Sequence, residues 1–307
     1  MNRDETTVVS FFLLAACLSI MPFLAFAEER SYSLEPFFRD VTIGSDSSQS
    51  YPIIITNQTD QDAVFRVSVT DFGTLDESGG IAFLGGGSNF SERYGLASWM
   101  RVDRERFVVP SGSSERVSVT ITDRDSLSPG GHYGAVVFEM LEDSSGAGQS
   151  DVSVKSSFAS LVFVTKYGGE VRSIRFAGTS IADTDLLGIP SKVASRFRND
   201  GNVHLVPRGR VTVTDLFGRV VREGIVNTES GRMLPESHRT YPTSLIFVRR
   251  AVFPGPYRVV FEYRYDGQDE FETSATLTTW PIGLIAVWLV GTSGIVFAGI
   301  RYSRRTA

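Results

Sequence analysis

Cysteine is almost absent from this chain. Cys17 is the only one among the 307 residues, and it lies in an apolar segment near the N-terminus. A disulfide needs two thiols and a structural zinc site usually needs several, so the sequence excludes thiol cross-links from the rest of the chain. Its folded domains must therefore be stabilised by apolar cores that hold without covalent help.

Signatures of catalysis are also missing. The three histidines, His132, His204 and His238, do not fall at metal-ligand spacing, and no Gly-x-Ser-x-Gly segment marks a hydrolase nucleophile. The kinase-like triplet at 71–73 lacks the glycine-rich loop, lysine and catalytic loop that accompany it in kinases. The acidic pairs 123/125 and 183/185 could bind calcium, although such pairs more often are solvated turns. We expect no enzyme, no cofactor and no metal site.

The charge balance is mildly acidic, with 30 basic and 35 acidic residues and a net charge of −5. Surfaces that bind nucleic acid or anionic membranes are basic, because they must neutralise phosphate groups. The composition therefore argues against a nucleic-acid partner.

A long uncharged apolar stretch lies at the C-terminus, where 21 residues from Trp280 to Ile300 carry no ionised side chain. A helix of that length is about 30 Å long, which matches the hydrocarbon core of a bilayer. Because backbone groups in lipid must be satisfied internally, such a span has to be helical. The sequence predicts a transmembrane helix at 280–300 and a basic cytoplasmic tail at 301–307. The expected anchor residues are Trp280, Trp288, Arg301, Arg304 and Arg305.

The N-terminus has the features of a secretory signal peptide over residues 1–27. An apolar run ends in Ala25-Phe26-Ala27, the small-x-small pattern that signal peptidase reads, so Ala25 and Ala27 are the expected cleavage residues. A second interpretation is a lipobox at 14–17, in which Cys17 becomes a lipidated N-terminus. Cleavage after Ala27 would give a single-pass type I protein of the cell membrane, with an extracellular ectodomain.

Between these two ends, short runs of alternating apolar and polar residues dominate, and turn clusters such as 57–60 and 199–202 separate them. No helical stripe of useful length is present there. This pattern is typical of an all-β protein built from β-sandwiches. The clearest predicted strands are 51–56, 63–70, 116–122, 133–141, 158–166, 171–176, 192–197, 210–214, 257–263 and 270–278.

The ectodomain also repeats itself, which indicates two copies of one fold. Three landmarks occur twice in the same order. They are an asparagine turn before a strand that ends in Thr-Asp (Asn57, Asn199), an apolar-proline turn with a serine (Ser113, Ser237), and a tyrosine between Pro-Gly and Val-Val-Phe-Glu (Tyr133, Tyr257). We predict two tandem immunoglobulin-like β-sandwich domains at 28–167 and 170–279, and we expect both tyrosines to pin a strand to a loop through the hydroxyl.

Only the first copy carries an insertion, at 78–96, with three consecutive glycines. Long irregular loops in compact domains are often mobile or functional. The aromatic residues Phe90 and Tyr94, together with the nearby Trp99, could stack on sugar rings or anchor a partner, so they form the candidate binding loop. The alternative is a mobile loop with Trp99 buried in the sandwich.

Several segments resemble the WxL-interacting proteins of Gram-positive cell surfaces. They are 33–36 (SLEP), 98–100 (SWM), 107–113 (FVVPSGS) and 129–136 (PGGHYGAV), followed by a second β domain, an apolar span and an arginine-rich tail. The resemblance covers most of 31–166 and is weaker over 170–279. It implies a first domain that binds peptidoglycan and a second that binds WxL surface proteins.

The sequence as a whole favours a non-enzymatic, membrane-anchored bacterial surface protein. We expect its β-sandwich ectodomain to bind a cell-wall polymer (peptidoglycan) or another surface protein. The alternative is a chaperone-like export or assembly factor with two domains, which would bind its clients by β-strand addition. A free sheet edge would favour this alternative, whereas an ordered insertion loop would favour adhesion.

Overall fold

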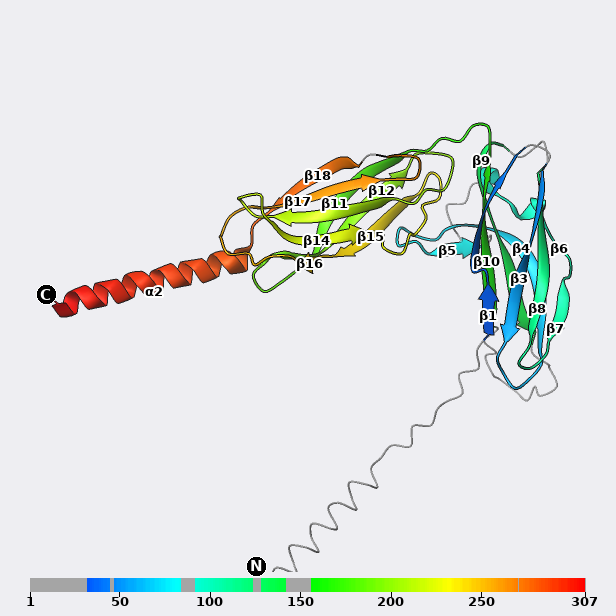
Figure 1. The fold of residues 1–307 in the computed structure, drawn as a ribbon, viewed down its shortest axis with the longest axis horizontal. Helices are drawn as coiled ribbons and strands as arrows, with labels where there is room; N and C mark the ends of the chain where they lie inside the picture. Colours follow the sequence, from blue (N-terminus) through cyan, green and yellow to red (C-terminus); the bar gives the residue numbers. More distant parts are fainter. Residues whose placement is uncertain are drawn as a thin grey trace, which may run out of the picture.

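A computed structural model describes residues 32–44, 47–83, 92–123, 128–141, 156–269 and 271–306. The chain is all-β, with two immunoglobulin-like sandwiches followed by a single long helix, as the sequence predicts (Figure 1). The cleavage residues Ala25 and Ala27, the lipobox Cys17 and the aromatic Phe90 lie outside the described residues.

The first domain is a sandwich of two sheets. One sheet has the order β1-β3-β8-β6, and the other has the order β2-β10-β9-β4-β5, with β7 also paired to β4. Strand β2 pairs parallel to β10, whereas the other pairs are antiparallel. The elements are β1 (Tyr32–Glu35), β2 (Phe38–Ile43), β3 (Ser48–Asn57), β4 (Ala63–Thr74), β5 (Ile81–Phe83), η1 (Glu92–Tyr94), η2 (Ala97–Trp99), β6 (Met100–Val102), β7 (Arg106–Val109), β8 (Ser114–Thr122), β9 (Gly130–Leu141) and β10 (Ser157–Lys166).

The second domain repeats this architecture. Its sheets have the orders β11-β12-β15 and β16-β14-β13-β17-β18. The strands are β11 (Ile174–Thr184), β12 (Pro190–Asn199), β13 (Arg208–Thr214), β14 (Val220–Val226), β15 (His238–Ser244), β16 (Ile246–Phe247), β17 (Tyr257–Arg264) and β18 (Glu272–Thr279). Each sandwich encloses its own apolar core, formed by the alternate residues that point between its two sheets.

The first repeated landmark is a buried asparagine that organises a turn. In the first domain the side-chain amide of Asn57 donates to the carbonyl oxygens of Gln61 (2.7 Å) and Val109 (3.1 Å). Its carbonyl oxygen accepts from the backbone N–H of Thr59 (3.0 Å). One side chain therefore satisfies three backbone groups, which explains why the turn requires asparagine.

Asn199 makes the equivalent bonds in the second domain. Its amide donates to the carbonyl oxygens of Val203 (2.8 Å) and Met233 (3.1 Å), and its oxygen accepts from the N–H of Gly201 (2.9 Å). The turn serines correspond as well, because the N–H of each asparagine donates to the carbonyl oxygen of Ser113 or Ser237. The internal repeat is thus reproduced bond by bond.

The two landmark tyrosines differ. The hydroxyl of Tyr257 donates to the carbonyl oxygen of Phe253 (3.0 Å), which pins β17 to the preceding loop as predicted. Tyr133 does not make the corresponding loop bond. Its ring lies instead among Phe72, Tyr94 and Phe163, on the outer face of the sheet that contains β9. This face is covered by the second domain.

All ten predicted strands correspond to observed strands, with shifted ends. The sequence patterns missed β1, β2, β5, β6, β7, β14, β15 and β16, most of which have four residues or fewer. After Pro281 the chain forms α2 (Ile282–Thr306), which contains an 18-residue window with a mean hydropathy of 2.0. It is long and apolar enough to cross a membrane, and it leaves the end of the second domain that lies away from the first (Figure 1).

Candidate functional site

The second domain packs against the outer face of the β10-β9-β4 sheet. Strand β9 is therefore buried on both faces over Gly130–Val136. In a sandwich strand with one solvated face, buried and exposed residues would alternate instead. The N–H of Gly131 donates to the carbonyl oxygen of Asn202 (2.7 Å), so this backbone bond links the two domains directly. We call this contact region the interdomain joint. His132, one of the three histidines, is a buried residue of this strand.

Asp40 is the centre of a charged cluster in the joint. It lies on β2 and accepts a hydrogen bond from His204 Nε2 (3.0 Å) and another from the guanidinium of Arg232, both in the second domain. The same guanidinium lies over the rings of Phe38 (4.1 Å) and Phe163 (5.0 Å). Cations over aromatic faces are stabilised by the ring quadrupole, so Arg232 joins a charge contact to an apolar one.

The Asp40 cluster predicts an acid-dependent loss of stability. Burial alone would raise the pKa of the Asp40 carboxyl, but hydrogen bonds from His204 and Arg232 outweigh it and hold the pKa below its ordinary value. Such a carboxyl stabilises the fold above its unfolded-state pKa, and the contribution is lost as pH falls through its folded-state pKa. The free energy of unfolding should therefore fall less steeply below about pH 4 in Asp40→Asn than in the wild type.

Urea unfolding between pH 7 and pH 3 measures this slope, with the exposed turn variant Asp60→Asn as the control. If the free energy of unfolding fell equally steeply with acid in the wild type and in Asp40→Asn, the cluster would add nothing to stability.

The described parts of the insertion also belong to the joint. Glu77, just before it, forms a two-pronged pair with Arg196 (2.6 and 2.7 Å). Within it, the buried Tyr94 donates its hydroxyl to Glu236 (2.8 Å). The side chain of Trp99 is half-buried against the first core and stacks on the ring of His132 (6.4 Å). Of the three candidate binding residues, Tyr94 is thus committed to the second domain and Trp99 to the first.

One carboxylate of each acidic pair considered for calcium has a cationic partner, and Asp125 lies outside the described residues. Asp123 forms a buried ion pair with Lys166 (2.9 Å). Asp185 pairs with Arg222 and also accepts two amides of its own turn. Both carboxylates are therefore used in holding the fold.

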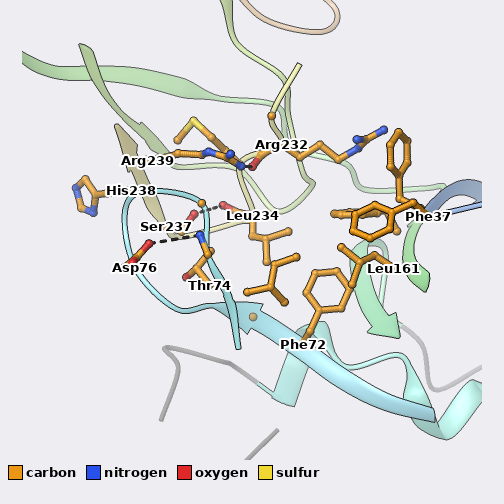
Figure 2. A pocket seen from close by; sticks show the side chains of 18 residues that line it. Phe37, Phe72, Thr74, Asp76, Leu161, Arg232, Leu234, Ser237, His238 and Arg239 are labelled. Carbon is orange, nitrogen blue, oxygen red and sulfur yellow. Dashed lines mark hydrogen bonds between the residues drawn. The ribbon is translucent and has the colours of Figure 1, made fainter. Parts of the chain in front are cut away.

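An apolar cavity of about 220 Å³ opens beside the joint (Figure 2). The side chains of Phe37, Phe72 and Leu161 gather at one side of it, Arg232 extends toward Phe37, and Arg239 lies farther from these rings. Phe37 is 65% exposed, which is unusual for so large an apolar side chain next to a pocket. The cavity could take apolar side chains of a partner.

The same aromatic side of the cavity adjoins an open sheet edge. The N–H of Leu161 on β10 donates outward to the carbonyl oxygen of Phe37, just before β2, and the N–H of Tyr167, just after β10, donates to that of Ile43 on β2. Because backbone groups alternate along a strand, the N–H groups of Ser157 and Ala159 point to this side too. Strand β2 begins only at Phe38, opposite Leu161, so within the described ranges no strand pairs with the outer edge of 157–160. We call this segment the open edge.

Several other edges are less suited to receive a strand. The outer strands β1, β5, β6 and β16 are very short, and β15 contains Pro242 and donates the N–H of Thr240 to Glu77. In the second domain β14 is covered by β16 only at 222–223, and the exposed Ile225 follows. That second uncovered edge lines a separate pocket with Pro242 and Ile246 and serves as the natural comparison.

Comparison with known proteins bears on the fold. No protein-family model and no curated protein matches the chain. A chain from a chaperone–tip adhesin complex of CFA/I fimbriae biogenesis is 11% identical, covers 82% of this chain and 99% of its own, and has a TM-score of 0.43. The class 5 fimbriae chaperone CfaA is 11% identical, covers 81% of this chain and 98% of its own, and has a TM-score of 0.39. The Escherichia coli chaperone DraB is 13% identical, covers 81% of this chain and 96% of its own, and has a TM-score of 0.38.

These structures correct the function predicted from the sequence. They come from fimbrial chaperones and a chaperone–adhesin complex, so our prediction that the ectodomain binds cell-wall polymer is wrong, and the chaperone-like alternative is the better supported of the two. Membrane anchoring stays a prediction. At this level of identity the likeness itself concerns the fold. The resemblance to WxL-interacting proteins stays a prediction.

The sequence reasoning missed most of the site. Phe37, Asp40, Ala159 and Arg232 were not singled out, although two signals were present. Adjacent phenylalanines stand at the start of β2 in a segment that is otherwise polar, and the apolar runs of β9 and β10 indicate strands covered on both faces. Both signals point to the outer face of one sheet.

Proposed function

We propose that this protein is a non-enzymatic, chaperone-like assembly factor that holds an extended segment of another surface protein by β-strand addition. The observation that carries the proposal is the open edge of β10 next to an apolar cavity. Strand addition uses main-chain hydrogen bonds for affinity and side-chain pockets for selectivity, and this region offers both. Membrane anchoring through α2 would keep the factor and its client at the site of export.

The open edge is the four-residue segment 157–160. Paired strands have the same rise of about 3.3 Å per residue, so the edge can accept about four residues of an added strand. Alternate side chains of that strand would face opposite ways. One set would lie toward Tyr32 and Phe158, whose rings are 5.8 Å apart, and the other toward Phe37 and the cavity. The expected client segment therefore has apolar side chains at alternate positions, as an unpaired strand of a β protein does.

Ala159→Pro tests this mechanism most directly. Proline removes the outward N–H of residue 159, but it leaves the β9–β10 ladder intact, because that ladder uses the neighbouring residues. We expect at least a tenfold loss of client binding, or about 1.4 kcal/mol, with little change in thermal stability. Ala159→Thr keeps the N–H and is the matched control.

Binding can be measured in cells with a photo-crosslinking amino acid at Ser157, or at Ile225 for the comparison edge. The proposal expects adducts from Ser157 whose client peptide is an alternating apolar segment. These adducts should be lost in Ala159→Pro and kept in Ala159→Thr. Crosslinks that survive Ala159→Pro, or that form only from Ile225, would move the site away from β10.

A further inference from the structure

Three loops surround the start of α2 at the far end of the second domain. Two of them, 185–189 and 215–219, share the sequence Asp-Leu-x-Gly-x and the same hydrogen bonds. In each loop one oxygen of the aspartate accepts the third and fifth amides, and the glycine has a positive φ (Gly188 +80°, Gly218 +75°). The third loop is 249–253. We call these three loops the collar.

The collar is bonded to the first two turns of the helix. The N–H of Leu284 donates to the carbonyl oxygen of Leu187 (2.9 Å), and its side chain is buried in the second core. One helical turn later, Trp288 Nε1 donates to the carbonyl oxygen of Val252 (2.6 Å). At Gly283 a Cβ would lie 2.3 Å from the carbonyl oxygen of Leu186, so only glycine permits this approach.

Aromatic contacts extend the attachment to the second loop. The ring of Trp288 stacks on Phe253 (6.2 Å), and Phe253 meets Phe217 edge-on (5.2 Å). Arg219 lies over both phenylalanine rings (5.1 and 5.4 Å). The helix is therefore fixed to the second domain as far as Trp288, rather than joined to it by a flexible tether.

This attachment leaves too little helix to cross a bilayer beyond the collar. From Leu289 to Ile300 there are 12 residues, which at 1.5 Å each span only ~18 Å of the ~30 Å hydrocarbon core. The seven residues Ile282–Trp288 supply about another 10 Å, but they are enclosed by the collar on part of their circumference. A crossing helix thus requires the collar itself to enter the membrane.

The exposed side chains of the collar suit that position. Leu186 is 99% exposed and Phe217 is 60% exposed, although both are large and apolar. Arg249 and Arg250 are exposed close by, and among the described residues neither has an ion pair. Apolar side chains combined with arginines are typical of surfaces that lie at the boundary between headgroups and acyl chains. Other exposed apolar residues at this end include Leu216, Val252 and Trp280.

We infer that the collar is a membrane-seated surface, which inserts Leu186 and Phe217 into the outer leaflet around the helix and places Arg249 and Arg250 among anionic headgroups. This inference rests on the membrane anchoring proposed above. The ligand is the lipid boundary itself, because the collar surrounds a helix of membrane-spanning length and makes up the length that the free part of the helix lacks.

Single-cysteine variants of the full chain test the inference in a Cys17→Ser background. An environment-sensitive fluorophore is attached at Leu186→Cys or Phe217→Cys, and the protein is reconstituted into vesicles of phosphatidylethanolamine and phosphatidylglycerol. Glu229→Cys, exposed at the opposite end of the same domain, is the aqueous control. Val296→Cys, in the middle of α2, is the anchor control.

We expect blue-shifted emission at 186 and 217, with quenching by lipids that carry a nitroxide near the headgroup. The label at 229 should remain quenched only by aqueous iodide. If 296 is quenched by lipid but 186 and 217 behave like 229, the anchor stands and the inference fails. If 296 also stays in water, membrane anchoring fails first. A label at 186 that is shielded from iodide but not quenched by lipid would mean that a second protein copy covers the collar, which also overturns the inference.

Discussion

Asn57→Ala and Asn199→Ala are each expected to lower the free energy of unfolding by about 3 kcal/mol, because each leaves several backbone groups without a partner. The amide of Asn57 serves two carbonyl oxygens and its oxygen serves one N–H, and Asn199 does the same in the second domain. Both side chains are fully buried, so water cannot replace these bonds without opening the turn.

Tryptophan emission during urea unfolding can assign each loss to a domain. Trp99 packs on the first core, whereas Trp288 is attached to the second domain. Gln49→Ala is the control, since Gln49 is exposed and makes a single bond to the Thr42 carbonyl oxygen (2.9 Å). Wild-type midpoints in both asparagine variants would show that the repeated turn is not a source of stability.

Tyr133→Ala should cost about 3–5 kcal/mol and should also release the second domain from the first. The ring is 1% exposed and lies under the joint, within 6.3 Å of Phe72, Tyr94, Phe163 and His204 between ring centres. Removing it leaves a cavity that neither sandwich can fill alone. The partner tyrosine of the repeat, Tyr257, has the same burial but lies at the far end of the second domain.

Tyr257→Ala is therefore the matched control for an effect on domain docking. Nitroxides at the exposed positions Arg116→Cys and Ser180→Cys, one in each domain, report the interdomain distance by pulsed electron resonance. We expect a broad distribution in Tyr133→Ala and a narrow one in Tyr257→Ala, although both variants lose stability. Equal widths would mean that the charged pairs alone hold the joint.

The sequence was sufficient to predict the two sandwiches because their determinants are local. Alternating strands and a turn that needs asparagine can be recognised within a few residues, and their recurrence at Asn57 and Asn199 marks the second copy. Short strands such as β1 and β16 give too few residues for a period to show. Their pairing depends on partners elsewhere in the chain, which no local pattern reveals.

The joint could not be predicted for the same reason. Asp40 and His204 are 164 residues apart, and Asp40 and Arg232 are 192 apart. Each of these residues has an ordinary local environment in the sequence. The insertion shows the limit most clearly, since Tyr94 was expected to serve an external ligand. In the folded chain its hydroxyl meets Glu236 of the second domain instead.

The joint and the collar together have a mechanical consequence. The covalent link between the domains is a short segment that contains Gly168 and Gly169, which by itself would let them swing freely. The joint bridges that segment from several sides, and the collar fixes α2 to the second domain. Tension on a segment held at β10 would therefore be transmitted through both sandwiches to the helix. The molecule would behave as a rigid connection between client and helix, not as a flexible tether.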